Sequence, residues 1–125
     1  MAKILIIDDD PVFSDMTKQR LERAGHRVTV HLGPFGATAA ASDGELDLII
    51  LDVFMPALSG PDLLEIMRKN QRTRAPVIFC SSMDPAPLKK LAAEHRAVGS
   101  VSKSAGRTEF IQTVERALAP LSEAQ

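Results

Sequence analysis

The chain has 125 residues, a length typical of a single domain that can bury a substantial core. Its 15 Lys and Arg residues nearly cancel its 16 Asp and Glu residues, so the overall charge offers no attraction to nucleic acid or to an anionic membrane. Cys80 is the only cysteine, which excludes an intramolecular disulfide and a metal site built on thiolates alone. The N-terminal apolar stretch is too short for a signal peptide or a membrane span, and we expect a cytoplasmic protein.

The N-terminal segment predicts a buried strand followed by a helix. Residues 4–7 form a continuous apolar run that ends at Asp8-Asp9-Asp10-Pro11. Asp10 before Pro11 is a helix-start signature, because Asp accepts hydrogen bonds from the free amides of the first turn and Pro is tolerated at the first helical position. Asp10 therefore has a structural role, whereas nothing local offsets the mutual repulsion of Asp8 and Asp9. The helix would end at Gly25, with one face made by Phe13, Met16, Thr17, Leu21 and Ala24.

Strand and helix continue to alternate along the chain. Residues 26–32 place Val28, Val30 and Leu32 on one side, which predicts a strand near the edge of a sheet. Three more strands are predicted, at 48–52, 76–80 and 97–102. Four helices are predicted between and after them: a short one within 34–44, one from Pro61, one after Asp84-Pro85 and a final one near the C-terminus. The helix from Pro61 would bury Leu63, Leu64, Ile66 and Met67, and the final helix has an apolar face made by Phe110, Ile111, Val114, Ala117, Leu118 and Leu121. This pattern predicts an α/β fold, a doubly wound parallel sheet with helices on both faces.

Polar residues end the predicted strands. They are Asp8 and Asp9, then Asp52, Ser81 and Lys103. The carboxyl ends of parallel strands share one edge, where open α/β sheets bind ligands. Carboxylates gathered there would repel one another by roughly 4 kcal/mol per pair at about 4 Å and an effective dielectric near 20. Oxygen-only ligands favour Mg²⁺, which recruits phosphate oxygens, and a nearby hydroxyl and ammonium suit an incoming phosphoryl group.

The sequence resembles the receiver domain of two-component response regulators over essentially the whole chain. The segments that carry the resemblance are ILIIDDDP (4–11), LDVFMP (51–56) with Gly60, PVIFCSS (76–82) and VSK (101–103). Each motif alone is weak, but their order and spacing together are specific. The resemblance implies a flavodoxin-like, five-stranded parallel sheet in the order 2-1-3-4-5. We expect one receiver domain spanning residues 1–125, with a polar tail from about residue 120.

The resemblance also implies a phosphoryl-acceptor site. Asp52 matches the phosphoacceptor, which attacks the phosphoryl group of a phosphohistidine on a partner kinase. Asp9 matches the direct Mg²⁺ ligand, Asp8 its neighbour acting largely through water, and the Phe54 backbone carbonyl a further ligand beside Asp52. The implied cofactor is therefore Mg²⁺.

Two further residues match groups that contact the phosphoryl oxygens. Ser81 matches the switch hydroxyl, with Ser82 as a rival, and Lys103 matches the pairing lysine. The implied partners are a sensor histidine kinase or phosphotransfer protein and an unknown downstream protein, with neither nucleic acid nor membrane bound by this domain. We expect a signalling switch of a phosphorelay and not an enzyme, beyond catalysing its own phosphorylation and dephosphorylation.

Two positions depart from the family pattern. Ser104 follows the lysine where proline is common, which puts a cis peptide there in doubt because a non-proline cis bond costs roughly 2.5–4 kcal/mol. Ser100 replaces the usual aromatic residue, so the familiar coupling of hydroxyl to aromatic ring cannot operate. One alternative is thus a degenerate receiver, a phosphorylation-independent interaction or localisation module. Another is a phosphatase of the haloacid dehalogenase type, but Phe54 stands where that family needs a second Asp.

Overall fold

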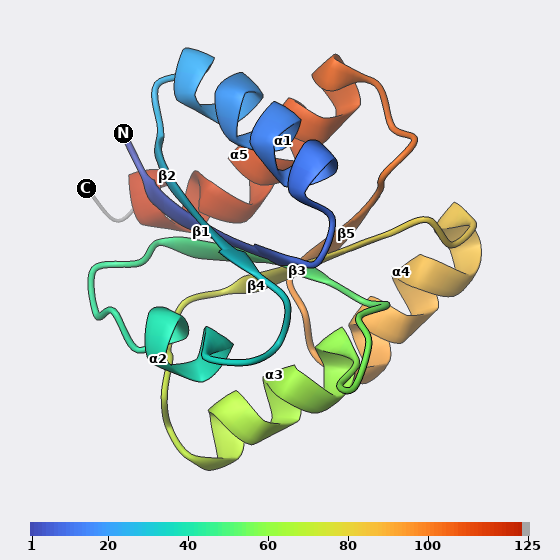
Figure 1. Ribbon diagram of the computed structural model, residues 1–125. Helices are drawn as coiled ribbons and strands as arrows, with labels where there is room; N and C mark the ends of the chain where they lie inside the picture. Colours follow the sequence, from blue (N-terminus) through green and yellow to red (C-terminus); the bar gives the residue numbers. More distant parts are fainter. Residues whose placement is uncertain (124–125) are drawn as a thin grey trace.

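A computed structural model describes the backbone of residues 1–123 and the side chains of residues 1–119 (Figure 1). The strands are β1 (Lys3–Asp8), β2 (Arg27–Leu32), β3 (Leu48–Asp52), β4 (Val77–Ser81) and β5 (Gly99–Ser102). The helices are α1 (Pro11–Arg23), α2 (Ala37–Ala41), α3 (Gly60–Lys69), α4 (Pro85–Glu94) and α5 (Arg107–Glu123). The strands form one parallel sheet in the order β2-β1-β3-β4-β5, which confirms the predicted topology.

Helices cover both faces of this sheet and enclose two hydrophobic cores. α2, α3 and α4 lie on one face, and α1 and α5 lie on the other (Figure 1). Successive residues of a strand enter opposite cores, so Leu5 packs with the first group of helices and Ile6 with the second. Every residue of β3 and β4 is buried, because these strands have neighbours on both sides and helices on both faces. Their continuous apolar runs follow from that double coverage.

Capping and turn residues fix three helix ends, and the sequence predicts two of them, at Asp10 and Gly25. The Asp10 carboxylate accepts hydrogen bonds from the Val12 and Phe13 amides at the start of α1. Gly25 follows α1 with φ of +97°, a conformation that glycine adopts without strain. Ser59 caps α3 by accepting a hydrogen bond from the Asp62 amide. Asp10 and Ser59 therefore fix where two helices begin at the carboxyl edge of the sheet, and Gly25 fixes where α1 ends before β2.

Three large apolar residues expected in buried faces are more exposed than predicted, and so is Ala24. Met16, Leu32 and Ile66 expose 38%, 55% and 39% of their surface. Ile66 lies at the margin of the α3 face that buries Leu63, Leu64 and Met67, and Leu32 ends an edge strand with a neighbour on one side only. The helix-start signature before α4 is also only partly realised, since the Asp84 side chain makes no capping hydrogen bond.

The final helix extends to Glu123. The expected polar tail from about residue 120 starts inside this helix, and its side chains lie outside the described residues. Within the described residues, no helix is both long enough and apolar enough to cross a lipid bilayer.

Ser14 gives a test of core packing. This residue is 1% exposed, and its hydroxyl oxygen has no hydrogen-bond partner among the described residues. We expect Ser14→Ala to raise the free energy of unfolding by about 1 kcal/mol, because it removes an unsatisfied polar atom and improves helix propensity. Urea denaturation followed by circular dichroism measures this change.

Thr113 supplies the matched control. Its hydroxyl donates a hydrogen bond to the Glu109 carbonyl, so Thr113→Val removes a satisfied group of similar volume. We expect this variant to lose about 1 kcal/mol of stability. Equal losses in both variants would show that the Ser14 hydroxyl is satisfied in solution.

Candidate functional site

Three carboxylates meet at the carboxyl edge of the sheet. Ile7 pairs with Leu51 across the β1–β3 ladder, so the next residues, Asp8 and Asp52, end adjacent strands side by side. Asp9 follows in the turn before α1. One carboxylate oxygen from each of Asp8, Asp9 and Asp52 lies within 4.8 Å of the others. Asp8 and Asp52 are buried whereas Asp9 is exposed, so the cluster opens toward solvent on one side.

Lys103 is the cation in contact with this cluster. Its ammonium lies 3.1 Å and 3.0 Å from the two carboxylate oxygens of Asp8 and 3.5 Å from Oδ2 of Asp52. The Lys103 amide donates a hydrogen bond of 2.8 Å to the Ser81 carbonyl, which ties the end of β5 to β4. Among the described residues, Lys103 thus brings one positive charge to two of the three carboxyl groups, those of Asp8 and Asp52.

The acidic cluster fits a divalent cation. Asp52 Oδ2 is buried, and no described residue donates a hydrogen bond to it. A buried carboxylate oxygen without a donor is costly unless a cation approaches it. Oxygen ligands from two or three Asp residues, completed by water, suit the octahedral shell of Mg²⁺. The donor set is therefore consistent with the cofactor that the sequence predicts.

Electrostatics at the site favour a protonated Asp52 in the metal-free protein. Burial raises the pKa of Asp52 to about 7, the neighbouring Asp8 and Asp9 raise it further, and Lys103 opposes the rise. Burial lowers the pKa of Lys103, but the hydrogen bond and charge of Asp8 and the charge of Asp52 outweigh it, so the lysine pKa is raised overall. Lys103 is accordingly a permanent cation beside a carboxyl group that titrates near neutrality.

Ser81 ends the strand next to β3, one residue beyond the Asp52–Cys80 pair, and Phe54 follows Asp52 by two residues. Ser81 is buried at the end of β4, and its hydroxyl accepts a hydrogen bond of 3.1 Å from the Met83 amide. Among the described residues it makes no hydrogen bond to Asp52. The Phe54 side chain is 59% exposed, and no described residue donates a hydrogen bond to its carbonyl. The sequence did not predict the hydrogen bond from the Met83 amide to the Ser81 hydroxyl, because this bond depends on the conformation of the loop after β4.

Gly60 lets α3 approach the backbone of Asp52. A Cβ at this position would lie 2.1 Å from the Asp52 carbonyl oxygen and 3.1 Å from the Val53 Cα. The Gly60 amide donates a hydrogen bond of 2.9 Å to the Val53 carbonyl. The sequence motif included this glycine, but only the structure shows that it contacts the acidic strand end directly.

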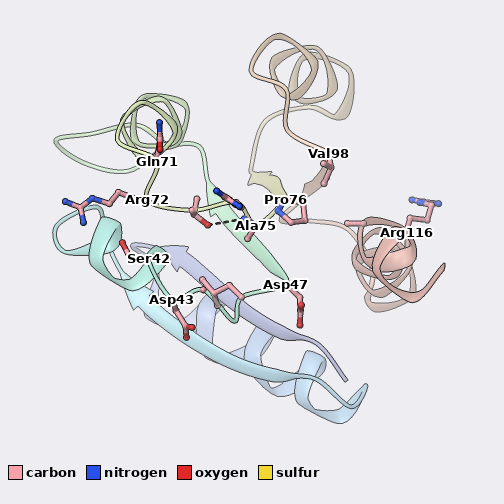
Figure 2. A pocket seen from close by; sticks show the side chains of 14 residues that line it. Ser42, Asp43, Asp47, Gln71, Arg72, Ala75, Pro76, Val98 and Arg116 are labelled. Carbon is pink, nitrogen blue, oxygen red and sulfur yellow. Dashed lines mark hydrogen bonds between the residues drawn. The ribbon is translucent and has the colours of Figure 1, made fainter. Parts of the chain in front are cut away.

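A cavity of about 850 Å³ lies at the opposite, amino edge of the sheet (Figure 2). Its lining includes Asp47, Pro76 and Val98, which precede β3, β4 and β5. Arg72 and Arg116 lie on opposite sides of it in Figure 2 and do not converge on one point. This cavity is thus remote from the carboxylates and does not belong to their chemistry.

Comparison with known proteins settles the family. The model of the response regulator receiver domain family matches residues 4–115. The chain belongs to this family. Receiver domains are the phosphoryl-accepting switches of two-component systems.

Individual relatives agree with this assignment. The receiver domain is 34% identical over 116 residues to the uncharacterized transcriptional regulatory protein YkoG of Bacillus subtilis, covering 92% of this chain and 50% of YkoG. It is 28% identical over 120 residues to Protein PilH of Pseudomonas aeruginosa, covering 95% of this chain and 99% of PilH. The chain thus spans half or less of several curated relatives that it matches.

Solved structures show the same fold. The receiver domain of the Francisella response regulator 1452 superposes with a TM-score of 0.85 at 27% identity, covering 97% of this chain and 99% of that one. The Vibrio cholerae chemotaxis protein CheY4 gives a TM-score of 0.83 at 26% identity, covering 94% and 99%. The flavodoxin-like order of strands is therefore shared with known receiver domains.

The close approach at Gly60 gives one prediction. Gly60→Ala should lower the free energy of unfolding by about 3 kcal/mol, because the new methyl group forces α3 away from the Asp52 carbonyl. Gly44→Ala is the control, since a Cβ there meets no atom within 4 Å. We expect that control to change stability by less than about 0.5 kcal/mol in urea denaturation. Equal effects of the two substitutions would contradict the contact.

The raised pKa of Asp52 gives a second prediction. The unfolded chain has an ordinary pKa of 3.8 at this residue and the folded state about 7, so the folded state binds more protons between these values. Stability supplied by the protonated carboxyl is therefore present below about pH 4 and lost as the pH rises through about 7. In metal-free buffer, Asp52→Asn should stabilise the protein by about 2–4 kcal/mol more at pH 8 than at pH 4. A pH-independent difference between wild type and variant, measured by urea denaturation with EDTA, would refute the shift.

Proposed function

We propose that Asp52 accepts a phosphoryl group in a Mg²⁺-dependent reaction and that the phosphorylated domain changes its binding to a downstream protein. The observation that carries this proposal is the buried Asp52 Oδ2, which lacks a hydrogen-bond donor among the described residues and lies 3.5 Å from the Lys103 ammonium. A carboxylate in this setting is both accessible to a cation and poised as a nucleophile. Asp8, Asp9 and Lys103 surround it with the charges that phosphoryl transfer requires.

The reaction follows from these groups. The ionised Asp52 carboxylate attacks phosphorus, and the bond from phosphorus to the donor nitrogen breaks with its electron pair returning to that nitrogen. The donor leaves as neutral imidazole, because the other ring nitrogen of the phosphohistidine carries a proton. Asp8, Asp9, Asp52 and the Phe54 carbonyl would hold Mg²⁺, which when bound neutralises charge on the carboxylates and the phosphoryl oxygens. Lys103 adds a second positive charge on the other side of the transferred group. Cations at the site also favour the ionised form of Asp52, which opposes the pKa rise caused by burial.

Ser81 links the site to the α4 end of the molecule. Its hydroxyl accepts the Met83 amide hydrogen bond in the structure. Turning the hydroxyl toward a phosphoryl group on Asp52 would break that bond and release the loop before α4. The Asp84 side chain makes no capping hydrogen bond, so a shift of the start of α4 would break no such bond. This movement of the loop and of α4 does not require an aromatic residue at position 100, which Ser100 occupies in this chain.

Partner and context follow from the family. The phosphodonor would be a histidine kinase or phosphotransfer protein, and the domain would act in the cytoplasm as a single receiver unit. The degenerate, phosphorylation-independent module is the less favoured reading, because the acids and the lysine that a phosphoryl group needs all lie together. These acids and the lysine are explained by phosphoryl acceptance, so a phosphatase that turns over phosphorylated metabolites is not needed to explain them.

Phosphorylation by a small-molecule donor tests the proposal. Incubation with acetyl phosphate or phosphoramidate and Mg²⁺ should add one phosphoryl group to the wild-type chain, detected by intact mass. Asp52→Asn should remain unlabelled, because its amide cannot act as the nucleophile. EDTA should abolish labelling of the wild type. Mg²⁺ alone should raise the wild-type melting temperature, since a ligand that binds only the folded state stabilises it.

Two results would count against the proposal. Labelling of Asp52→Asn at the wild-type rate would place the acceptor elsewhere. A folded, Mg²⁺-bound wild type without label from either donor would favour the phosphorylation-independent module.

A further inference from the structure

An aromatic ring contacts the Lys103 ammonium together with the carboxylates. The ring belongs to Phe13 of α1, and its centroid lies 4.8 Å from Nζ with the cation over the ring. The Lys103 side chain is 20% exposed, so water competes only in part for the ammonium. The lysine is therefore held by contacts of two kinds, the carboxylate oxygens of Asp8 and Asp52 and a neutral ring.

The position of Phe13 is fixed from two directions. Its amide donates a hydrogen bond of 3.1 Å to the Asp10 carboxylate, which sets the first turn of α1. Its ring meets the Phe110 ring of α5 edge-on, with centroids 6.4 Å apart and planes at 64°. The ring is 8% exposed. Its face is thus presented to Lys103 by the capped helix start and by the packing of α1 against α5.

Charge at the site explains why a neutral contact matters. Both oxygens of Asp8 contact Lys103, yet Asp8 is also one of the groups proposed to hold Mg²⁺. A divalent cation on Asp8 would compete with the lysine for the same oxygens and would repel the ammonium. The ring attracts a cation through its quadrupole, carries no net charge, and neither binds the metal nor repels a phosphoryl group.

We propose that Phe13 is a positioning residue whose ring face keeps the Lys103 ammonium beside Asp52 for phosphoryl binding. This inference rests on the proposed function, because it assumes that Lys103 pairs with the transferred group. The sequence placed Phe13 only on the buried face of a helix, since the contact with Lys103 joins residues from opposite ends of the chain. A leucine would fill similar space but would present no quadrupole to the cation.

Phe13→Leu compared with Phe110→Leu separates this role from packing. Both variants lose the edge-on contact between the two rings, but only Phe13→Leu removes the ring beneath Lys103. We expect the apparent affinity for beryllofluoride with Mg²⁺, followed by two-dimensional NMR, to fall about three- to tenfold in Phe13→Leu and less than about twofold in Phe110→Leu. The rate of labelling by acetyl phosphate should fall in the same ratio.

Two further measurements show that the effect passes through the lysine. In a Lys103→Met background, Phe13→Leu should change the beryllofluoride affinity less than about twofold, because the double-mutant cycle removes the cation that the ring holds. In lysine-labelled wild type, the ε-methylene protons of Lys103 should be shifted upfield by the ring current, and Phe110→Leu should keep that shift. Phe13→Tyr, which retains the ring, should restore affinity and provides a second variant if Phe13→Leu is poorly folded.

The outcomes distinguish this inference from the function on which it rests. Equal affinities of Phe13→Leu and Phe110→Leu, in a protein whose wild type is labelled on Asp52, would overturn the role of Phe13 alone. An undiminished effect of Phe13→Leu in the Lys103→Met background would do the same, since it would show that the ring acts by packing. Failure of the wild type to accept label on Asp52 would overturn the proposed function and this inference together.

Discussion

The mutual repulsion of carboxylates at one edge of a sheet is the constraint on which the rest of this structure depends. Asp8, Asp9 and Asp52 approach within 4.8 Å, and two of them are buried. Lys103 offsets part of this charge, and the Asp52 pKa rises to about 7 as a result of burial and the remaining repulsion. Asp52 therefore holds a proton more tightly than an ordinary aspartate does, and the acidic cluster is compatible with a cation.

The fold supplies the rigidity needed to hold these groups together. β3 and β4 are buried on both faces, so the strand ends that carry Asp52 and Ser81 cannot shift without disturbing both cores. Gly60 brings α3 onto the Asp52 carbonyl, and the Lys103 amide is bonded to the Ser81 carbonyl. The elements around the acids are thus fixed through the backbone. The side-chain bond between Ser81 and the Met83 amide is a contact that can be exchanged without breaking the sheet.

The two departures from the family pattern lie on β5 and in the turn that follows it. No peptide bond among the described residues is cis, which agrees with the doubt raised by Ser104 after Lys103. Ser100 lies on β5 and is half-buried, and it leaves no aromatic side chain to follow a movement of Ser81. In the proposed function, the response to phosphorylation therefore passes through the loop before α4. This receiver domain thus keeps the acidic cluster of the family and lacks the aromatic residue through which many relatives transmit a change at the switch hydroxyl.

The sequence by itself determined the class of fold, the order of strands and helices, and the residues that end each strand, because buried parallel strands and capped helix starts leave strong local patterns. Its errors fell on margins, such as Ile66 on α3 and the uncapped Asp84, where exposure depends on how neighbouring elements lie. Only the tertiary structure decided that Lys103 contacts Asp8 more closely than Asp52, and that Phe13 faces the ammonium. These contacts join α1, β1, β3 and the end of β5. Their distances depend on packing across the whole sheet, which no local pattern encodes.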